Sequence, residues 1–317
     1  MRFTNNGEVR VVYMGTPEIS ARVLSSILDA GYNVVAVVSN EDKEVGRRHE
    51  LESTPVKKVA LAHNIPVFQP EKIKGSNALE IINELKPDAI IVVAYGKILP
   101  PYILTAAKYG CINVHASLLP KYRGAAPIQW AVLNGDSETG VCIMQMDEGI
   151  DTGDIIAVKK IPIDPDETSE LLFERLSVLG ADTLIEALKA VEEGKVEPTP
   201  QPKGDFGYAK MISRELCPID WSKSALEIHN QVRGLQTWPV AITTLNGKNI
   251  KIHKTKIIDF PADSPGKIVD NNKRLIVSCG DNKCLEIKEL QAEGKKRMDS
   301  KAFLLGNKVE IGTVLGE

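Results

Sequence analysis

The 317-residue sequence has few cysteines and histidines and no long apolar run. Its five cysteines form no C-x-x-C pair, and such an odd, scattered set indicates reduced thiols rather than disulfides or a zinc site. No apolar run reaches the ~18 residues that a membrane span requires. Residues Met1–Arg10 also lack the apolar region of a signal peptide. These absences favour a cytoplasmic protein with no membrane partner.

Glycine is scarce where a dinucleotide-binding fingerprint would need it. The apolar run Val9–Met14 ends at Gly15, a helical pattern covers Glu18–Ala30, and Asn33–Ser39 has the composition of a strand. This is a β-α-β opening of the nucleotide-binding type, yet only Gly15 stands where the fingerprint requires three glycines. The sequence therefore argues against NAD as a cofactor.

Strands and helices continue to alternate up to residue 193, which predicts a doubly wound, mostly parallel α/β sheet in a first domain of residues 1–193. The charged segment Glu41–Thr54 has no periodicity and is predicted to be a surface loop. The remaining predicted helices cover 55–62, 77–85, 101–108, 128–133 and 169–193, and the remaining strands cover 66–68, 88–94, 140–146, 155–163 and a central strand from Cys111.

The second half of the chain has a different character. Residues 194–209 are rich in proline and glycine and are predicted to be a linker. The segment 210–317 is predicted to begin with a helix over 222–233, followed by short strands over 241–245, 250–258, 275–278 and 285–290. This spacing indicates a small antiparallel β domain.

The charge is distributed unevenly between these halves. Residues 1–209 carry 21 Lys and Arg against 29 Asp and Glu, a balance of −8, whereas residues 210–317 carry 18 against 13, a balance of +5. A basic appendage suits a polyanionic substrate, because phosphate contacts draw on clustered Lys and Arg. The same surplus would also serve to keep a small domain in solution.

One pair of side chains stands out as a candidate site. Asn113 and His115 alternate with apolar residues, so both project from one face of the central strand, and Pro120 and Gly124 then lead the chain into a loop. Parallel α/β sheets hold ligands at such strand ends. No pair of histidines in the sequence has metal-ligand spacing, which argues against a metal centre.

An acidic loop follows about thirty residues later and offers a partner for His115. Its carboxylates are Asp147, Glu148, Asp151 and Asp154. The residues by themselves do not distinguish among these four. Aspartate in Asp-x-Gly patterns commonly stabilises turns, which favours a structural role for Asp147 and Asp154.

The composite Asn113-x-His-x-Ser-Leu-Leu-Pro-x-x-Arg-Gly124, which continues into Ala125–Gln129, resembles the folate-dependent formyltransferases. The block Met146–Asp154 and the pairs Arg233-Gly234 and Trp238-Pro239 extend the resemblance over nearly the whole chain. It implies the formyltransferase fold, a Rossmann-like sheet followed by a C-terminal OB-like β-barrel that binds tRNA. It also implies 10-formyltetrahydrofolate as formyl donor, methionyl initiator tRNA as acceptor and no metal, and we expect a monomer.

The resemblance also implies roles for individual residues. Asn113 would donate to the oxyanion, protonated His115 would bind the oxyanion and assist the leaving folate nitrogen, and Asp151 is the carboxylate that the family motif selects. Four consecutive residues would form the wall of the folate pocket, namely Ser117, Leu118, Leu119 and Pro120. The leucines are equally compatible with a place in the core.

A departure from the family pattern concerns the loop that approaches the tRNA. The usual Gly-Arg-Gly-Lys-Lys-Leu run is replaced by Gly46-Arg-Arg-His-Glu-Leu51, so two lysines are lost and one arginine is gained. Arg47 and Arg48 are the residues expected to contact tRNA phosphates.

Two alternative functions follow from the same residues. The catalytic domain could formylate a different amine, such as an amino sugar nucleotide or a glycinamide ribonucleotide, because Asn113, His115 and Asp151 do not distinguish among acceptors. The chain could also be an RNA-binding protein without catalysis, although the complete set of polar site residues argues against this.

Overall fold

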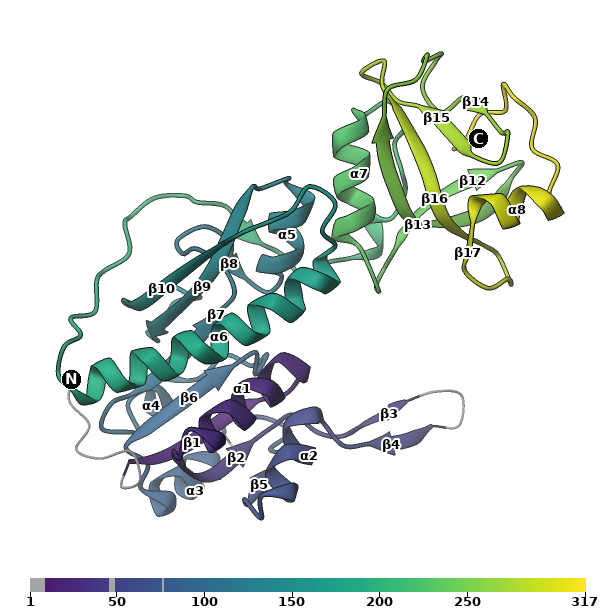
Figure 1. Cartoon of the computed structure of the whole chain (residues 1–317). Helices are drawn as coiled ribbons and strands as arrows, with labels where there is room; N and C mark the ends of the chain where they lie inside the picture. Colours follow the sequence, from purple (N-terminus) through teal and green to yellow (C-terminus); the bar gives the residue numbers. More distant parts are fainter. Residues whose placement is uncertain (1–8, 46–48, 76) are drawn as a thin grey trace. The chain divides into compact units, whose positions relative to one another are not determined.

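A computed structural model of the chain describes residues 9–45, 49–75 and 77–317 (Figure 1). The chain forms two compact units. The first unit comprises the residues up to Ala125 together with 139–161 and 173–209, and the second comprises 126–138, 162–172 and 210–317. The division of the sequence at residues 193 and 209 remains a prediction.

The first unit is built on a seven-stranded sheet with the strand order β10-β9-β7-β6-β1-β2-β5. The five strands from β5 to β7 in this order are parallel, whereas β9 pairs antiparallel with β7. The predicted doubly wound, mostly parallel sheet is therefore confirmed. The bounds are β1 (Arg10–Gly15), β2 (Asn33–Val38), β5 (Val67–Phe68), β6 (Ala89–Val93), β7 (Cys111–His115), β9 (Glu138–Gln145) and β10 (Ile155–Pro162).

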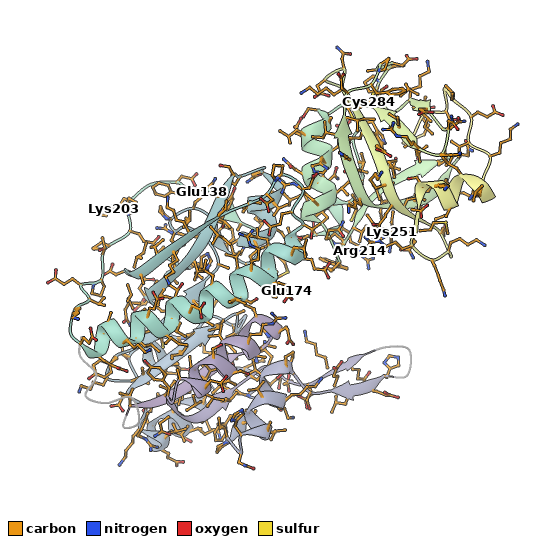
Figure 2. The ribbon with its side chains drawn as sticks, viewed as in Figure 1. Glu138, Glu174, Lys203, Arg214, Lys251 and Cys284 are labelled. Carbon is orange, nitrogen blue, oxygen red and sulfur yellow. The ribbon has the colours of Figure 1, made fainter. Side chains whose placement is uncertain are left out.

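Amphipathic helices cover this sheet. Two of them, α1 and α6, lie side by side (Figure 1), and Arg22 Nη2 of α1 lies 2.5 Å from Glu174 Oε2 of α6 (Figure 2). The predicted start of α2 at Pro55 is confirmed, because Thr54 Oγ1 caps the helix by accepting from Lys57 N. The bounds are α1 (Glu18–Asp29), α2 (Pro55–Ala62), α3 (Ala78–Leu85), α4 (Pro101–Leu104) and α6 (Ser169–Glu192).

Two predictions for this unit were wrong. The segment Glu41–Thr54 is not a plain loop, because it contains an antiparallel pair of short strands, β3 (Lys43–Val45) and β4 (Glu50–Glu52). The two strands pair with each other and β4 is exposed throughout, so no buried face imposes a period on the sequence. The helix predicted over 101–108 ends at Leu104, and the chain continues through turns over residues 105–109 before it enters β7.

The second unit contains a curled antiparallel sheet with the order β12-β13-β16-β15-β14, and β17 pairs with β16 (Figure 1). This agrees with the predicted OB-like β domain. Its strands are β12 (Ala241–Leu245), β13 (Lys248–Ile258), β14 (Ile268–Asp270), β15 (Leu275–Ser278), β16 (Cys284–Ala292) and β17 (Met298–Asp299), and its helices are α5 (Pro127–Leu133), α7 (Ala225–Gly234), α8 (Ser300–Gly306) and the 3-10 turn η1 (Arg214–Leu216).

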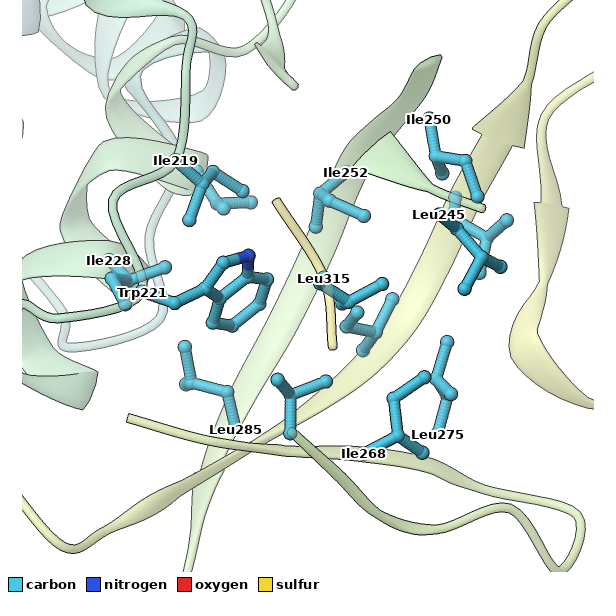
Figure 3. Packing of buried hydrophobic residues seen from close by; sticks show 14 of the residues in the cluster. Ile219, Trp221, Ile228, Leu245, Ile250, Ile252, Ile268, Leu275, Leu285 and Leu315 are labelled. Atoms are coloured by element: carbon cyan, nitrogen blue, oxygen red, sulfur yellow. The ribbon is translucent and has the colours of Figure 1, made fainter. Parts of the chain in front are cut away.

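The core of this unit is apolar and surrounds Trp221 (Figure 3). Ile252, Leu275 and Leu285 are buried in it, and each such side chain contributes about 1.5–3 kcal/mol by leaving water. The indole Nε1 of Trp221 donates to Thr243 Oγ1 at 2.9 Å, so its one polar atom is satisfied inside the core. The sequence did not reveal β14, β17 or α8, which are short and have little periodicity.

Candidate active site

The central strand β7 carries the predicted pair of polar side chains. It lies between β6 and β9, with Asn113 opposite Met144 and His115 opposite Cys142. Asn113 is 8% exposed and His115 is 6% exposed. The side-chain amide of Asn113 has no hydrogen-bond partner among the residues that the structure describes, so its N–H groups are available to a ligand.

The imidazole of His115 lies between a carbonyl and a carboxylate. Its Nε2 lies 3.0 Å from the backbone oxygen of Tyr122, and its Nδ1 lies 3.6 Å from Oδ2 of Asp151. A carbonyl oxygen only accepts hydrogen bonds, so Nε2 carries the hydrogen and donates a hydrogen bond to the backbone oxygen of Tyr122. Nδ1 is therefore the nitrogen through which His115 can exchange a proton.

Both residues that face this ring have a left-handed backbone. Tyr122 has φ +61° and Asp151 has φ +53°, and neither is glycine. This conformation is unfavourable for residues other than glycine, less so for aspartate than for tyrosine, and such strain concentrates at functional sites. The chain thus holds the carbonyl of Tyr122 and the carboxylate of Asp151 against His115 at an energetic cost.

The four acidic residues of the loop occupy different positions. Asp151 is the one whose carboxylate reaches His115, and its Oδ2 also accepts from Gly124 N at 2.8 Å. Asp147 Oδ1 accepts from Gly149 N and Thr152 Oγ1 within its own turn. Glu148 and Asp154 are exposed. The structure thus supplies the choice of carboxylate that the residues themselves left open.

The residues predicted to form the folate wall, Ser117–Pro120, follow β7 directly. The hydroxyl of Ser117 donates to Lys121 O at 2.6 Å, and Leu119 packs against Cys142 and Met144. Leu118 and Pro120 are half-buried. The side chains of Ser117 and Leu119 are occupied by contacts within the protein. A folate bound at this segment would therefore contact chiefly its backbone.

The nearest thiol does not supply a nucleophile. Burial raises the pKa of Cys142 to about 11, and its sulfur accepts from Leu119 N at 3.3 Å. A thiol with this pKa stays protonated at neutral pH, and the thiolate is the nucleophilic form. The amide, the imidazole and the carboxylate therefore remain the candidate reactive groups of this site.

A cavity of about 730 Å³ lies beside the segment that leads into Asp151. Sequence reasoning missed it, because its lining combines the turn after α4 with the start of the acidic loop. Its volume is typical of small-molecule sites. The lining includes Leu104, Thr105, Ala107, Tyr109, Gln145, Met146 and Glu148.

A second cavity of about 570 Å³ lies in the second unit. Arg214 and Lys251 line it (Figure 2), together with Trp238, whose side chain is 53% exposed. None of the described residues that line it is acidic. The two β-branched residues that flank the Trp238-Pro239 pair have a left-handed backbone, Thr237 with φ +68° and Val240 with φ +71°.

The remaining predictions concern residues or features outside these sites. Arg47 and Arg48 lie outside the described residues. Within 9–45, 49–75 and 77–317, no cluster of three His, Cys, Asp or Glu side chains could hold a metal ion. No helix in the same part of the chain is long and apolar enough to cross a membrane.

Comparison with known proteins connects both units to formyl transfer. Residues 9–188 match the Formyl transferase family, and residues 211–308 match its C-terminal domain. A methionyl-tRNA formyltransferase from Agathobacter rectalis is 50% identical and the match covers 96% of this chain and 99% of that protein. Another, from Alkaliphilus oremlandii, is 45% identical over 98% of this chain and 100% of its own length.

Solved structures with lower identity share the fold. An N-formyltransferase from Helicobacter canadensis, in complex with folinic acid and dTDP-3-aminofucose, has a TM-score of 0.69 and 22% identity, and the match covers 90% of this chain and 99% of that one. HypX from Aquifex aeolicus has a TM-score of 0.64 at 17% identity, and the match covers 96% of this chain and 52% of that chain.

Proposed function

Since the chain belongs to the formyltransferase family, we propose that it transfers the formyl group of 10-formyltetrahydrofolate to the α-amino group of methionyl initiator tRNA, giving N-formylmethionyl-tRNA for translation initiation. The choice of methionyl-tRNA as acceptor rests on the similarity to methionyl-tRNA formyltransferases, at up to 50% identity over nearly the full chain. The sugar N-formyltransferases match at 22% identity, which supports the fold alone.

Asn113, His115 and Asp151 have the properties that this reaction needs. The amine attacks the formyl carbon, and the new oxyanion accepts from the unpaired amide of Asn113. The resulting ammonium passes a proton to Nδ1 of His115, because Nε2 is bound to Tyr122 O. Asp151 stabilises the imidazolium from 3.6 Å. The bond between carbon and folate nitrogen then breaks, and that nitrogen takes the proton from Nδ1.

The formyl donor would lie along the acidic loop. The end of β9 and the start of that loop, Gln145–Glu148, line the cavity of about 730 Å³, and the middle of the loop carries Asp151 beside His115. In register along β7, Gln145 is opposite Ile112 and three residues, roughly 10 Å, separate Ile112 from His115. This distance would allow the ring system of the donor to lie in the cavity while its formyl group lies near Asn113. The backbone of Ser117–Pro120 would also contact the donor.

The second unit offers contacts for the RNA of the acceptor. Residues 210–317 carry the charge balance of +5, and the cavity beside Trp238 combines two cations with an exposed indole. Lysine and arginine bind phosphates, and an indole can stack on any of the nucleobases. An unpaired nucleotide of the acceptor is therefore the group that we place there.

The proposal is tested by supplying competing acceptors. The protein is incubated with 10-formyltetrahydrofolate and, in parallel, with methionyl initiator tRNA, methionyl elongator tRNA, an amino sugar nucleotide and glycinamide ribonucleotide. We expect formylmethionine from the initiator tRNA at a kcat/KM at least about 100-fold above that for any other acceptor. Preferential formylation of either small acceptor would overturn the proposed acceptor.

A further inference from the structure

One glutamine outside the predicted site joins its two halves. Gln201 lies in the segment that the composition predicted to be a linker. Its Nε2 donates to the backbone oxygens of Asp151 at 3.0 Å and Gly153 at 2.8 Å. Its Oε1 accepts from Nε of Arg123 at 3.1 Å and from Nη2 at 2.7 Å. All four contacts are therefore made by a single side-chain amide.

The orientation of this amide follows from its partners. Both N–H groups face carbonyl oxygens, and the oxygen faces a guanidinium, which has donors and no acceptor. In the flipped orientation, the amide oxygen would face the carbonyl oxygens of Asp151 and Gly153, and the two N–H groups would face the guanidinium of Arg123. Only one orientation satisfies every atom, so Gln201 connects the loop that carries Asp151 to the side chain of Arg123 in a fixed geometry.

Residues before and after Gln201 bind β10, which follows the acidic loop, and the segment of Arg123. On one side, Thr199 exchanges two backbone hydrogen bonds with Ile155, at 2.8 and 2.9 Å. On the other, β11 (Tyr208–Ala209) pairs in parallel with β8 (Arg123–Gly124). We call residues 199–209 the strap. It is held at both ends, so Gln201 is not a freely moving linker residue.

The strap approaches β8 so closely that only glycine fits at position 124. A Cβ on Gly124 would lie 2.7 Å from the backbone oxygen of Ala209. The N–H of the same glycine donates to Oδ2 of Asp151. Asp151 is thus held at its carboxylate by a residue that the strap positions, and at its carbonyl by Gln201 itself.

We propose that Gln201 is a positioning residue for the reaction, which holds the left-handed Asp151 so that its carboxylate stays near Nδ1 of His115. This inference rests on the proposed function, because it assigns Gln201 an effect on the chemical step. The left-handed backbone of Asp151 is less favourable than an ordinary one, so this residue relaxes when nothing holds it. Removal of the two carbonyl contacts permits that relaxation, which moves the carboxylate away from the ring.

The main test uses Gln201→Met, which keeps the length of the side chain and removes all four contacts. We expect kcat to fall about 10- to 100-fold, as displacements of about 1 Å in an active site do. The KM values for donor and acceptor should change less than about threefold, because every polar atom of the Gln201 side chain is occupied by contacts within the protein. A kcat within twofold of that of the unaltered protein overturns the proposal.

Gln69→Met is the matched control. Gln69 lies in the same unit and its amide is satisfied in a similar way, by Asn40 O, Asp42 Oδ1 and Lys57 Nζ at 2.7–2.8 Å. Its loss should lower the thermal unfolding temperature about as much as Gln201→Met does, with kcat unchanged. An equal loss of kcat in both variants would mean that Gln201 acts only through stability, and would overturn the positioning role.

A double-mutant cycle with Asp151→Ala shows whether Gln201 acts through Asp151. We expect Gln201→Met to lower kcat less than about twofold in the Asp151→Ala background, because no carboxylate is left to position. A full, additive loss in that background contradicts the mechanism.

The last arm separates this inference from the proposed function. The NMR signals of the His115 ring in the full chain report the proximity of Asp151 whatever the acceptor is. In Gln201→Met they should move toward those of Asp151→Ala, whereas in Gln69→Met they should stay in place. Unchanged His115 signals in Gln201→Met overturn the inference even if methionyl-tRNA is formylated, and shifted signals support it even if another amine is the acceptor.

Discussion

Nδ1 of His115 lies 3.6 Å from Oδ2 of Asp151, although the two residues are 36 positions apart in the sequence. The separation slightly exceeds a hydrogen bond, so the pair is close enough to stabilise a charged ring and leaves Nδ1 free to exchange a proton with a substrate. Because Tyr122 O occupies the other nitrogen, the proposed reaction uses the side of the ring that faces Asp151.

The first prediction concerns the carboxylate. Asp151→Ala should lower kcat at least about 100-fold while the KM for 10-formyltetrahydrofolate stays within threefold, because the imidazolium loses its counter-charge. Asp154→Ala is the control in the same loop, since that side chain is exposed, and steady-state kinetics should show a rate close to that of the unaltered protein. Equal rates for both variants would remove Asp151 from the mechanism.

The second prediction concerns the donor cavity. Thr105 is exposed at its lining, so Thr105→Trp should partly fill the cavity without disturbing the core. We expect the KM for 10-formyltetrahydrofolate to rise at least about tenfold, with the KM for methionyl-tRNA unchanged. Thr105→Ser keeps the cavity open and should behave like the unaltered protein. If the tryptophan leaves donor binding intact by calorimetry, the donor lies elsewhere.

The third prediction concerns the acceptor. Lys251→Glu should raise the KM for methionyl-tRNA about tenfold or more and reduce its dependence on salt, because one phosphate contact is lost and a repulsion is added. Donor binding should not change. Lys308→Glu is the matched charge reversal, at a lysine that pairs with Glu310 on the surface and lies outside the cavity. Equal effects of both reversals would indicate a response to net charge rather than a contact at the cavity.

The fourth prediction concerns stability at acid pH. Burial lowers the pKa of His229 below its usual 6.5, and the ring contacts Thr255 Oγ1 at 2.9 Å. The unfolded chain therefore takes up this proton at a higher pH than the folded chain, so stability falls as the pH drops below about 6.5. His253, whose pKa burial also lowers, contributes in the same direction. Thermal unfolding between pH 7.5 and 5 should show the loss, and His229→Gln should make the curve flatter.

Much of the fold was predictable because its signals are local. The continuous apolar residues of β6, the proline and capping threonine before α2, and the alternation of Asn113 and His115 on β7 each depend on neighbours within a few positions. The pair β3 and β4 was missed, because strands that pair with each other at the surface need no buried face and therefore leave no period in the sequence.

The sequence by itself determined the two-part organisation, the parallel sheet, the polar pair on the central strand and the resemblance that suggests formyl transfer. The resemblance selected Asp151, and the tertiary structure shows that its carboxylate reaches His115. Only the tertiary structure decided which nitrogen of that ring is bound to Tyr122, and that Gln201 joins Arg123 to the loop that carries Asp151. Asp151 and Gln201 lie 50 positions apart, and Arg123 lies 78 positions from Gln201. Contacts over such separations depend on where the chain returns after forming several strands, and no local periodicity carries that information.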